Sequence, residues 1–254
     1  MSRKKYLNLL HQLAVSRFKL KDQSALLGFL WSFLHPLIML GILFAMFRYQ
    51  TGHSVEHYAI YLLVGLVQYT HFSNCTSRAM TVLYSMRQLT ADAIFPKEVL
   101  VLSSVIADTI ELLLAMIICV VIAGFSGISI SWAILMLPFV WVLQFMLVSS
   151  VALVLSSVYV FARDIGHIYN AFLRLLIFIT PIFYDPSFLG EGLGRYILLL
   201  NPLTYLITFS RALIIEGKPV GFEPTIFLLL VSSLLLVCSF KLFKNYEPAF
   251  SEYL

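Results

Sequence analysis

The sequence predicts an all-α, polytopic membrane protein with six transmembrane helices, an N-terminal amphipathic interface helix and two short outer re-entrant helices. Apolar residues make up 60% of its 254 residues and charged residues only 12%, whereas soluble domains carry roughly 25% charged residues. Six segments are also apolar over the length of about 20 residues that a helix needs to cross a bilayer. The basic residues gather on one side of these segments. Together these observations exclude a soluble enzyme.

The chain forms a single predicted domain, residues 1–254. The six-helix membrane bundle covers residues 26–242, and a cytoplasmic tail covers residues 243–254. Each predicted span is a mostly apolar run with polar or charged residues near its ends. The six spans are Leu26–Phe47, Tyr58–Tyr84, Val99–Ala123, Trp132–Phe161, Ile168–Tyr184 and Thr225–Leu242.

Residues 1–25 differ from the rest because apolar and basic residues are interspersed with a helical period. Leu7, Leu10, Ala14 and Phe18 recur at intervals of three or four residues, which places them on one face of a helix. Basic amphipathic helices of this kind lie in the inner headgroup layer of a membrane. We therefore expect an interface helix, with a plain cluster of orienting charges as the alternative.

The segment between the fifth and sixth spans, residues 185–223, is long and partly apolar. Its runs Tyr196–Leu200 and Leu203–Ile215 are too short to cross a bilayer comfortably, and Pro202 separates them. Backbone that enters a membrane without crossing it must be shielded by protein. Two short helices that dip into the outer leaflet are predicted here.

The Lys and Arg residues indicate the orientation of the spans. With the N-terminus in the cytoplasm, 13 basic residues lie on the cytoplasmic side, helix ends included, and four lie outside. Cytoplasmic loops carry such an excess of Lys and Arg, and an even number of spans then puts both termini inside. The cytoplasmic set is Arg3, Lys4, Lys5, Arg17, Lys19, Lys21, Arg78, Arg87, Lys97, Arg163, Arg174, Lys241 and Lys244, and the outer set is Arg48, Arg195, Arg211 and Lys218.

Two acidic residues fall inside the third predicted span. Asp108 and Glu111 stand three residues apart on one helical face, about three turns from the cytoplasmic end. Acids at this depth are costly and mark functional positions by default. Arg174 in the fifth span lies at a similar depth, and Arg78 in the second is also a possible partner. An intramembrane ion pair of Asp108, Glu111 and Arg174 is predicted, with a proton relay as the alternative.

Aromatic residues recur along two of the spans. Their faces can stack on sugar rings without fixing them, which suits a polymer that slides. Helix packing or lipid contact is the alternative interpretation. The stripe in the first span is Phe29, Phe33, Leu40, Phe44 and Phe47, and the stripe in the fifth is Phe172, Leu176, Ile179 and Phe183.

The sequence lacks the motifs of a nucleotide-driven or hydrolytic site. It nowhere reads G-x-x-x-x-G-K-[ST], the loop that cradles phosphates, so any nucleotide-driven work must come from another chain. No Gly-x-Ser-x-Gly elbow is present either. His53, Glu56 and His57 form H-x-x-E-H, but they fall in a short outer loop, and His71 lies about four turns away. No metal, cofactor or catalytic residue is predicted on this chain.

Four stretches, in order along the chain, resemble the type-2 ABC exporter permeases of the polysaccharide and polyol-phosphate export family. They open the first span, follow the first cytoplasmic loop, bracket the fifth span and begin the second outer helix. O-antigen exporters are the members that they resemble most. The stretches are Ser24–Trp31 with His35–Leu37, Phe95–Leu100, Arg163–Ile165 with Thr180–Tyr184, and Asn201–Tyr205 with Arg211 downstream.

The resemblance implies one half of a transporter rather than an enzyme. Such permeases form a homodimer, and two copies of a separate cytoplasmic ATPase, which binds ATP and Mg²⁺, dock on it. The loop before the third span would supply a coupling helix for that ATPase, and the outer re-entrant helices would form an external gate. The coupling residues implied are Arg87, Asp92, Phe95, Pro96, Lys97, Glu98, Arg163 and Asp164.

The function that follows from this resemblance is export of a lipid-linked glycan or polyol-phosphate polymer across the inner membrane. Three alternatives stay open: a small-molecule or drug exporter of the same fold, a proton-coupled secondary transporter, and a membrane-embedded glycosyltransferase or scaffold. Aromatic residues of the first and fifth spans would line the path between protomers. These residues are Phe29, Phe33, Phe44, Phe47, Phe172, Phe183 and Tyr184.

Overall fold

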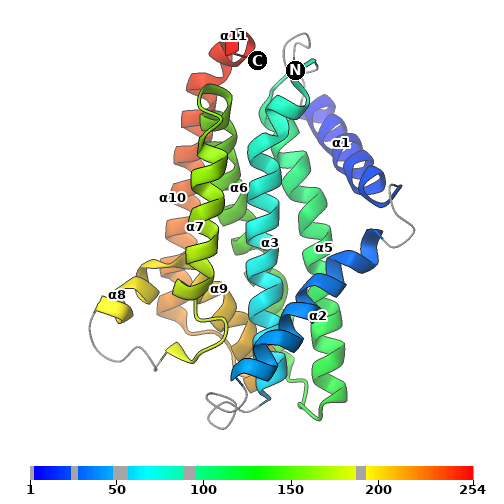
Figure 1. Ribbon diagram of the computed structural model, residues 1–254, viewed down its shortest axis with the longest axis vertical. Coiled ribbons are helices and arrows are strands. Elements are labelled where there is room, and N and C mark those ends of the chain that lie inside the picture. The colour runs from blue at the N-terminus through cyan, green and yellow to red at the C-terminus, as the bar shows by residue number, and fades with distance from the viewer. Residues whose placement is uncertain (1–2, 24–27, 48–56, 89–94, 187–192, 254) are drawn as a thin grey trace.

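A computed structural model describes residues 3–23, 28–47, 57–88, 95–186 and 193–253, and these residues form helices without any strand (Figure 1). The predicted all-helical class is therefore confirmed for this part of the chain. The elements are α1 (Arg3–Gln23), α2 (Gly28–Phe47), α3 (Tyr58–Ser85), α5 (Glu98–Phe125), η1 (Trp132–Met136), α6 (Leu137–Phe161), α7 (Ile165–Ile179), α8 (Leu193–Leu200), α9 (Pro202–Arg211), η3 (Ala212–Glu216), α10 (Phe222–Tyr246), η4 (Glu247–Ala249) and α11 (Phe250–Tyr253).

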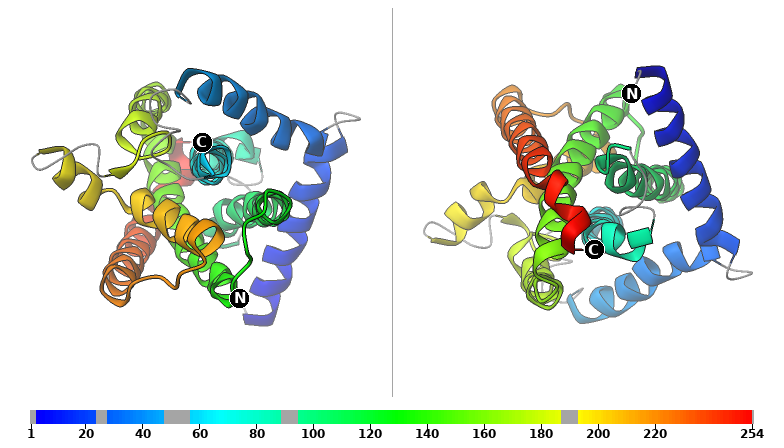
Figure 2. Two further views of the ribbon diagram at one scale, coloured as in Figure 1. Left: turned by 90° about the horizontal axis from the view of Figure 1, so that it is seen from below. Right: turned by 90° about the horizontal axis from the view of Figure 1, so that it is seen from above.

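The helices α3, α5, α6, α7 and α10 run side by side along one axis, α1 and α2 are inclined to it, and both chain ends lie at the same end of the bundle (Figure 1). α3 lies at the centre and contacts α2, α5, α6, α7 and α9. The views along the axis in Figure 2 show α3 enclosed by these neighbours, whereas α10 and α1 lie at the periphery. α1 packs beside α5.

Three helical segments are long and apolar enough to cross a membrane: Glu98–Phe125, Trp132–Phe161 and Phe222–Tyr253. Two further helices, Pro36–Met46 and Ile165–Ile179, are apolar but shorter. A protein that is all helix and carries such segments is built for a bilayer. The broader prediction of a helical membrane protein is confirmed.

α3 is the most polar of the long helices after α1, and its position explains why. It carries Gln68, His71 and Asn74 within its 28 residues, yet it is buried along most of its length. The peripheral helix α10, by contrast, exposes Leu230 and Leu234. Polar side chains in a membrane helix are tolerated where they face protein, and apolar ones suit the lipid-facing surface. The polarity of α3 thus reflects its central place.

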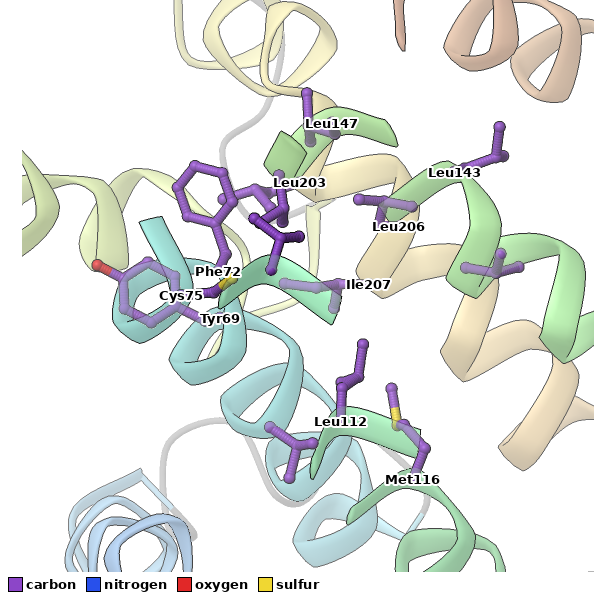
Figure 3. Packing of buried hydrophobic residues seen from close by; sticks show 14 of the residues in the cluster. Tyr69, Phe72, Cys75, Leu112, Met116, Leu143, Leu147, Leu203, Leu206 and Ile207 are labelled. Atoms are coloured by element: carbon purple, nitrogen blue, oxygen red, sulfur yellow. The ribbon is translucent and has the colours of Figure 1, made fainter. Parts of the chain in front are cut away.

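The core joins four helices that are distant in sequence. Figure 3 shows the α3 residues Tyr69, Phe72 and Cys75 near apolar side chains from α5, α6 and α9. Leu206 and Ile207 of α9 are fully buried. The short helix α9 is therefore part of the core and forms one packed body with α3 and α6. The other labelled core residues are Leu112, Met116, Leu143, Leu147 and Leu203.

The fifth predicted span, Ile168–Tyr184, is helical only as far as Ile179. α7 ends at Ile179, and Thr180 has an extended backbone with φ −83° and ψ 134°. The next residue is Pro181, which lacks an amide hydrogen and disfavours helical geometry in the residue before it. Residues 180–184 are consequently unwound.

Two short helices follow, as predicted for residues 185–223. They are α8 and α9, and Pro202 is the first residue of α9, where its fixed φ suits a helix start. The side chain of Asn201 caps α9 by accepting a hydrogen bond of 3.1 Å from the amide of Leu203. The predicted N-terminal helix is likewise present as α1.

Candidate functional site

The unwound segment after α7 is held by a buried arginine. Arg211, at the end of α9, is only 4% exposed. Its Nη1 donates to the carbonyl of Pro181 at 2.7 Å, and its Nη2 donates to the carbonyl of Ile182 at 2.6 Å. Its Nε donates to the carbonyl of Tyr61 at 3.0 Å. One guanidinium thus joins α9, α3 and the end of α7.

Two tyrosines of α3 complete this arrangement. The hydroxyl of Tyr58 donates to the carbonyl of Phe183 at 2.9 Å, and that of Tyr61 donates to the carbonyl of Tyr184 at 3.0 Å. The guanidinium carbon of Arg211 also lies 3.3 Å from the centre of the Tyr61 ring, a cation–π contact. We call Arg211, Tyr58, Tyr61 and the carbonyls of residues 181–184 the outer clasp.

A glycine makes room for the clasp. A Cβ atom on Gly65 would lie 2.6 Å from Nη2 of Arg211, so any larger residue would displace the guanidinium. On the other side, Nδ2 of Asn201 donates to Oγ1 of Thr180 at 2.9 Å. The sequence analysis quoted Arg211 only as part of a motif. The signal in the sequence that could have indicated this site is a single arginine at the end of the apolar helix Pro202–Arg211.

A cavity of about 520 Å³ lies between α2, α3 and α7. One end of it reaches Phe183 in the unwound segment. Its wall is mostly apolar but carries one cation, Arg174, and several amides and hydroxyls, and of these polar residues the sequence analysis singled out only Arg174. The lining residues are Met39, Leu43, Leu66, Tyr69, Thr70, Ser73, Asn74, Asn170, Leu173, Arg174, Ile177, Phe178 and Phe183.

The aromatic residues predicted to line a path do not share one surface. Phe183 lines the cavity, and Phe44 stacks on Tyr58 with ring centres 6.2 Å apart. Phe172 instead lies on an exposed side of α7, stacked on Tyr169. The hydroxyl of Tyr184 donates to carbonyls near the end of α7. The side chains of Phe29, Phe33 and Phe47 lie outside the described residues.

The predicted stripe Phe172, Leu176, Ile179 and Phe183 continues only to the end of α7. Phe172, Leu176 and Ile179 share one side of this helix, but Leu176 is buried against the bundle, whereas Phe172 is 47% exposed. Phe183 lies beyond the end of α7, where helical spacing no longer applies. Helical spacing thus predicts a shared side of a helix but not how deeply neighbouring helices cover each residue.

The intramembrane acids pair with Arg78. Its Nη2 lies 3.0 Å from Oδ1 of Asp108, and its Nε donates to Oδ2 at 3.1 Å. Oε2 of Glu111 lies 4.0 Å from the same Nη2. Arg174, the partner expected from its depth, lines the cavity instead. Arg78 and Arg174 lie at similar depth, so the sequence allowed either as the partner of Asp108. The packing of the helices selects Arg78.

At the other end of the bundle, Lys97 and Glu98 face the C-terminal segment. Lys97 donates from its amide to Glu247 at 2.7 Å and from Nζ to Ser251 at 2.6 Å. Glu98 accepts from Nζ of Lys244 at 2.8 Å, and Glu247 accepts from the same atom at 2.9 Å. Both Lys97 and Glu98 are buried, so their side chains are engaged with the C-terminal segment of their own chain, and their coupling to an ATPase stays a prediction.

The charges of this C-terminal network affect two lysines in opposite ways. Burial lowers the pKa of Lys97, and only the charge of Glu247 opposes this. Burial also acts to lower the pKa of Lys244, but hydrogen bonds and charges from Glu98 and Glu247 outweigh it and raise the pKa above its usual value. Lys244 is therefore firmly protonated at neutral pH.

Other expected coupling residues are exposed at the same end. Arg163 lies 4.2 Å from the centre of the Tyr84 ring, and Arg87 donates to the Tyr84 hydroxyl at 3.2 Å. Asp164 is exposed beside Arg163, while Phe95 and Pro96 are half-buried. Asp92 lies outside the described residues. The two arginines and their shared tyrosine present positive charge at the surface.

An all-helical bundle with segments long enough to span a membrane and a cavity between its helices is typical of a membrane transport protein. The sequence model of the ABC-2 type transporter family matches residues 9–215, and the chain belongs to this family. It is 27% identical over 248 residues to the O-antigen export system permease protein RfbA of Myxococcus xanthus, which covers 97% of this chain and 95% of that protein. Two Klebsiella pneumoniae proteins of the same name are 25% and 23% identical, covering 93% of this chain and 91% of each.

Proposed function

We propose that this chain is the membrane subunit of an ATP-driven exporter that moves a lipid-linked polysaccharide, of the O-antigen kind, across the inner membrane. The observation that carries the proposal is the nearly full-length similarity to three proteins named as O-antigen export permeases. The cavity supports it, because its wall combines aromatic rings with amides and hydroxyls. Sugars present apolar faces and hydroxyls together, so a wall of this kind suits them.

The proposed membrane arrangement has six spans: α2, α3, α5, η1 with α6, α7, and α10. α8 and α9 enter the outer leaflet without crossing it, and both termini lie in the cytoplasm. α7 has 15 residues, about 22 Å of helix, which is shorter than the ~30 Å hydrocarbon core. The unwound residues 180–184 complete this span. Non-helical backbone at membrane depth requires protein partners, and the outer clasp supplies them.

The proposed assembly is a homodimer. A cavity of about 520 Å³ has the size of a small-ligand pocket and cannot enclose a polymer. The exposed side of α7, which includes Ile168, Leu175 and Phe178, offers an apolar surface beside this cavity. A second copy against it would give the path a complete wall.

Energy comes from a separate ATPase in this proposal. Arg87, Arg163 and Asp164 are exposed, and together with Asp92 they form its docking surface. Two ATPase copies bind ATP and Mg²⁺, and this chain binds no cofactor. Lys97 and Glu98 act indirectly, because they connect the end of the loop to the C-terminal segment.

The proposal is tested by deleting the gene and measuring the polymer at the cell surface. We expect surface polymer to be lost, lipid-linked polymer to accumulate inside, and the wild-type chain to restore export. The chain is also expected to co-purify with an ATPase in equal amounts. Normal surface polymer after deletion, together with accumulation of a small toxic compound, would point to a drug exporter instead.

A further inference from the structure

Arg174 lies in the membrane part of the bundle without a counter-charge among the described residues. It faces the cavity between α2, α3 and α7, and no acidic residue belongs to the cavity wall. The intramembrane acids Asp108 and Glu111 are paired with Arg78. No ion pair or hydrogen bond joins Arg174 to another residue in the described part of the chain. The side chain of Arg174 is exposed in this chain, so its guanidinium is open to a ligand that enters the cavity.

Polar side chains surround this cation in an ordered way. On α7, Asn170 stands four residues before Arg174, so both lie on one helical face. On α3, Thr70 and Asn74 have the same spacing and line the opposite wall. The wall therefore presents one guanidinium, two amides and a hydroxyl to the same space.

Apart from Ser73 and Tyr69, the rest of the cavity wall is apolar. Met39 and Leu43 come from α2, Leu66 from α3, and Ile177 and Phe178 from α7. A ligand with a compact anion and hydrocarbon beside it would match both parts of this wall.

We infer that Arg174, with Asn170 and Asn74, binds a phosphate group of the lipid that carries the exported glycan. This inference rests on the proposed function. A guanidinium matches phosphate oxygens with two parallel hydrogen bonds, and a charge-assisted pair is the strong kind. The amides donate to the remaining oxygens, and the apolar wall contacts the adjoining hydrocarbon of the lipid. The cavity volume of about 520 Å³ suits this end of the substrate and not the whole polymer.

The test uses the purified full-length chain in detergent and three lipids. The lipids are undecaprenyl phosphate, uncharged undecaprenol and phosphatidylglycerol, with binding measured by native mass spectrometry. The variants are Arg174→Gln, which removes the charge, and Arg174→Lys, which keeps it without the planar fork. Lys241→Gln is the matched control, because Lys241 is an exposed cation of α10 that does not line the cavity.

We expect Arg174→Gln to weaken undecaprenyl phosphate binding about 10- to 100-fold, the loss typical of a charge-assisted hydrogen-bonded contact. Arg174→Lys should retain part of the affinity, and undecaprenol binding should not change. Equal binding of undecaprenyl phosphate by the wild type and Arg174→Gln overturns the inference. An equal loss of phosphatidylglycerol binding also overturns it, because the site would then be one for bilayer headgroups.

A cellular readout separates this inference from the proposed function. The wild-type chain must restore surface polymer in the deletion strain, or the proposed function fails by itself. With that established, Arg174→Gln is expected to reach the membrane at normal levels and to export poorly. Normal export by Arg174→Gln would overturn the role of Arg174 and leave the proposed function standing.

Discussion

Replacing Arg211 with Gln tests whether the outer clasp fixes the end of α7. The wild-type guanidinium makes three hydrogen bonds of 2.6–3.0 Å to the carbonyls of Tyr61, Pro181 and Ile182. Gln keeps a donor but is too short and has the wrong geometry to reach all three carbonyls. The variant therefore leaves at least two buried carbonyls without their partner.

The expected loss of stability in Arg211→Gln can be worked out from these three hydrogen bonds. Hydrogen bonds to a charged group contribute about 1.5–3 kcal/mol each, so three give at least ~4.5 kcal/mol. Removing a buried cation also removes its desolvation cost, which returns part of that free energy. We expect a net loss of about 2–4 kcal/mol. For a chain of this size, ~1 kcal/mol corresponds to about 2–4 °C, so the apparent melting temperature should fall by roughly 5–15 °C.

The assay is thermal unfolding of the purified protein in detergent, with limited proteolysis of residues 180–186 as a local readout. Lys218→Gln is the matched control, since Lys218 is an exposed cation that contacts only Glu216. We expect Lys218→Gln to melt like the wild type and Arg211→Gln to be cleaved faster. An Arg211→Gln protein with wild-type melting and wild-type cleavage would refute the clasp as a stabilising feature.

Three further predictions concern the path, the ion pair and the C-terminal network. Phe44→Ala with Phe183→Ala should reduce surface polymer severalfold without reducing assembly, and normal export in that double variant would exclude both residues from the lining. Asp108→Asn should lower the free energy of unfolding by about 1–2 kcal/mol, because the ion pair with Arg78 is lost and only a weaker hydrogen bond remains. Export should persist in this variant. Complete loss of export at normal stability would instead support a proton relay. Glu98→Gln should destabilise the chain by about 1 kcal/mol at neutral pH. The lysine partner of Glu98, Lys244, has a pKa raised above 10.5. The stability difference between the wild type and Glu98→Gln should therefore persist from neutral pH to about pH 10.5 and shrink as the pH rises further. A stability difference that vanishes at pH 8 would contradict the ion pair between Glu98 and Lys244.

The sequence predicted the helices well because length and apolarity decide where a span begins and ends. The second span was expected at Tyr58–Tyr84, and α3 covers Tyr58–Ser85. The depth of Asp108 was also clear from its place in its span. Its partner was not, because two arginines lie at similar depth and their directions depend on how α3 and α7 are rotated in the bundle. The rotation of a helix within the bundle cannot be predicted from the pattern of residues in that helix alone.

The sites at the two ends of the bundle were harder to predict for a related reason. The resemblance identified Lys97 and Glu98 as motif residues, but a motif does not say whether a side chain faces a partner protein or its own chain. The C-terminal segment that binds them lies about 150 residues away. Arg211 is similar, because its acceptors are carbonyls, which every residue has. The sequence therefore offers no complementary side chain by which to recognise the clasp.

The outer clasp also limits how α7 can move to open the proposed transport path. α9 is packed into the core through Leu206 and Ile207, so Arg211 moves with the central bundle. The end of α7 is held mainly through the carbonyls of residues 181–184 and one contact to Thr180. Any motion of α7 that widens the cavity must therefore either carry α9 and α3 along or break these bonds. Because carbonyls do the accepting, the hydrogen bonds of the outer clasp do not depend on which side chains stand at residues 183 and 184, whereas Ile182 is fixed by its burial in the core.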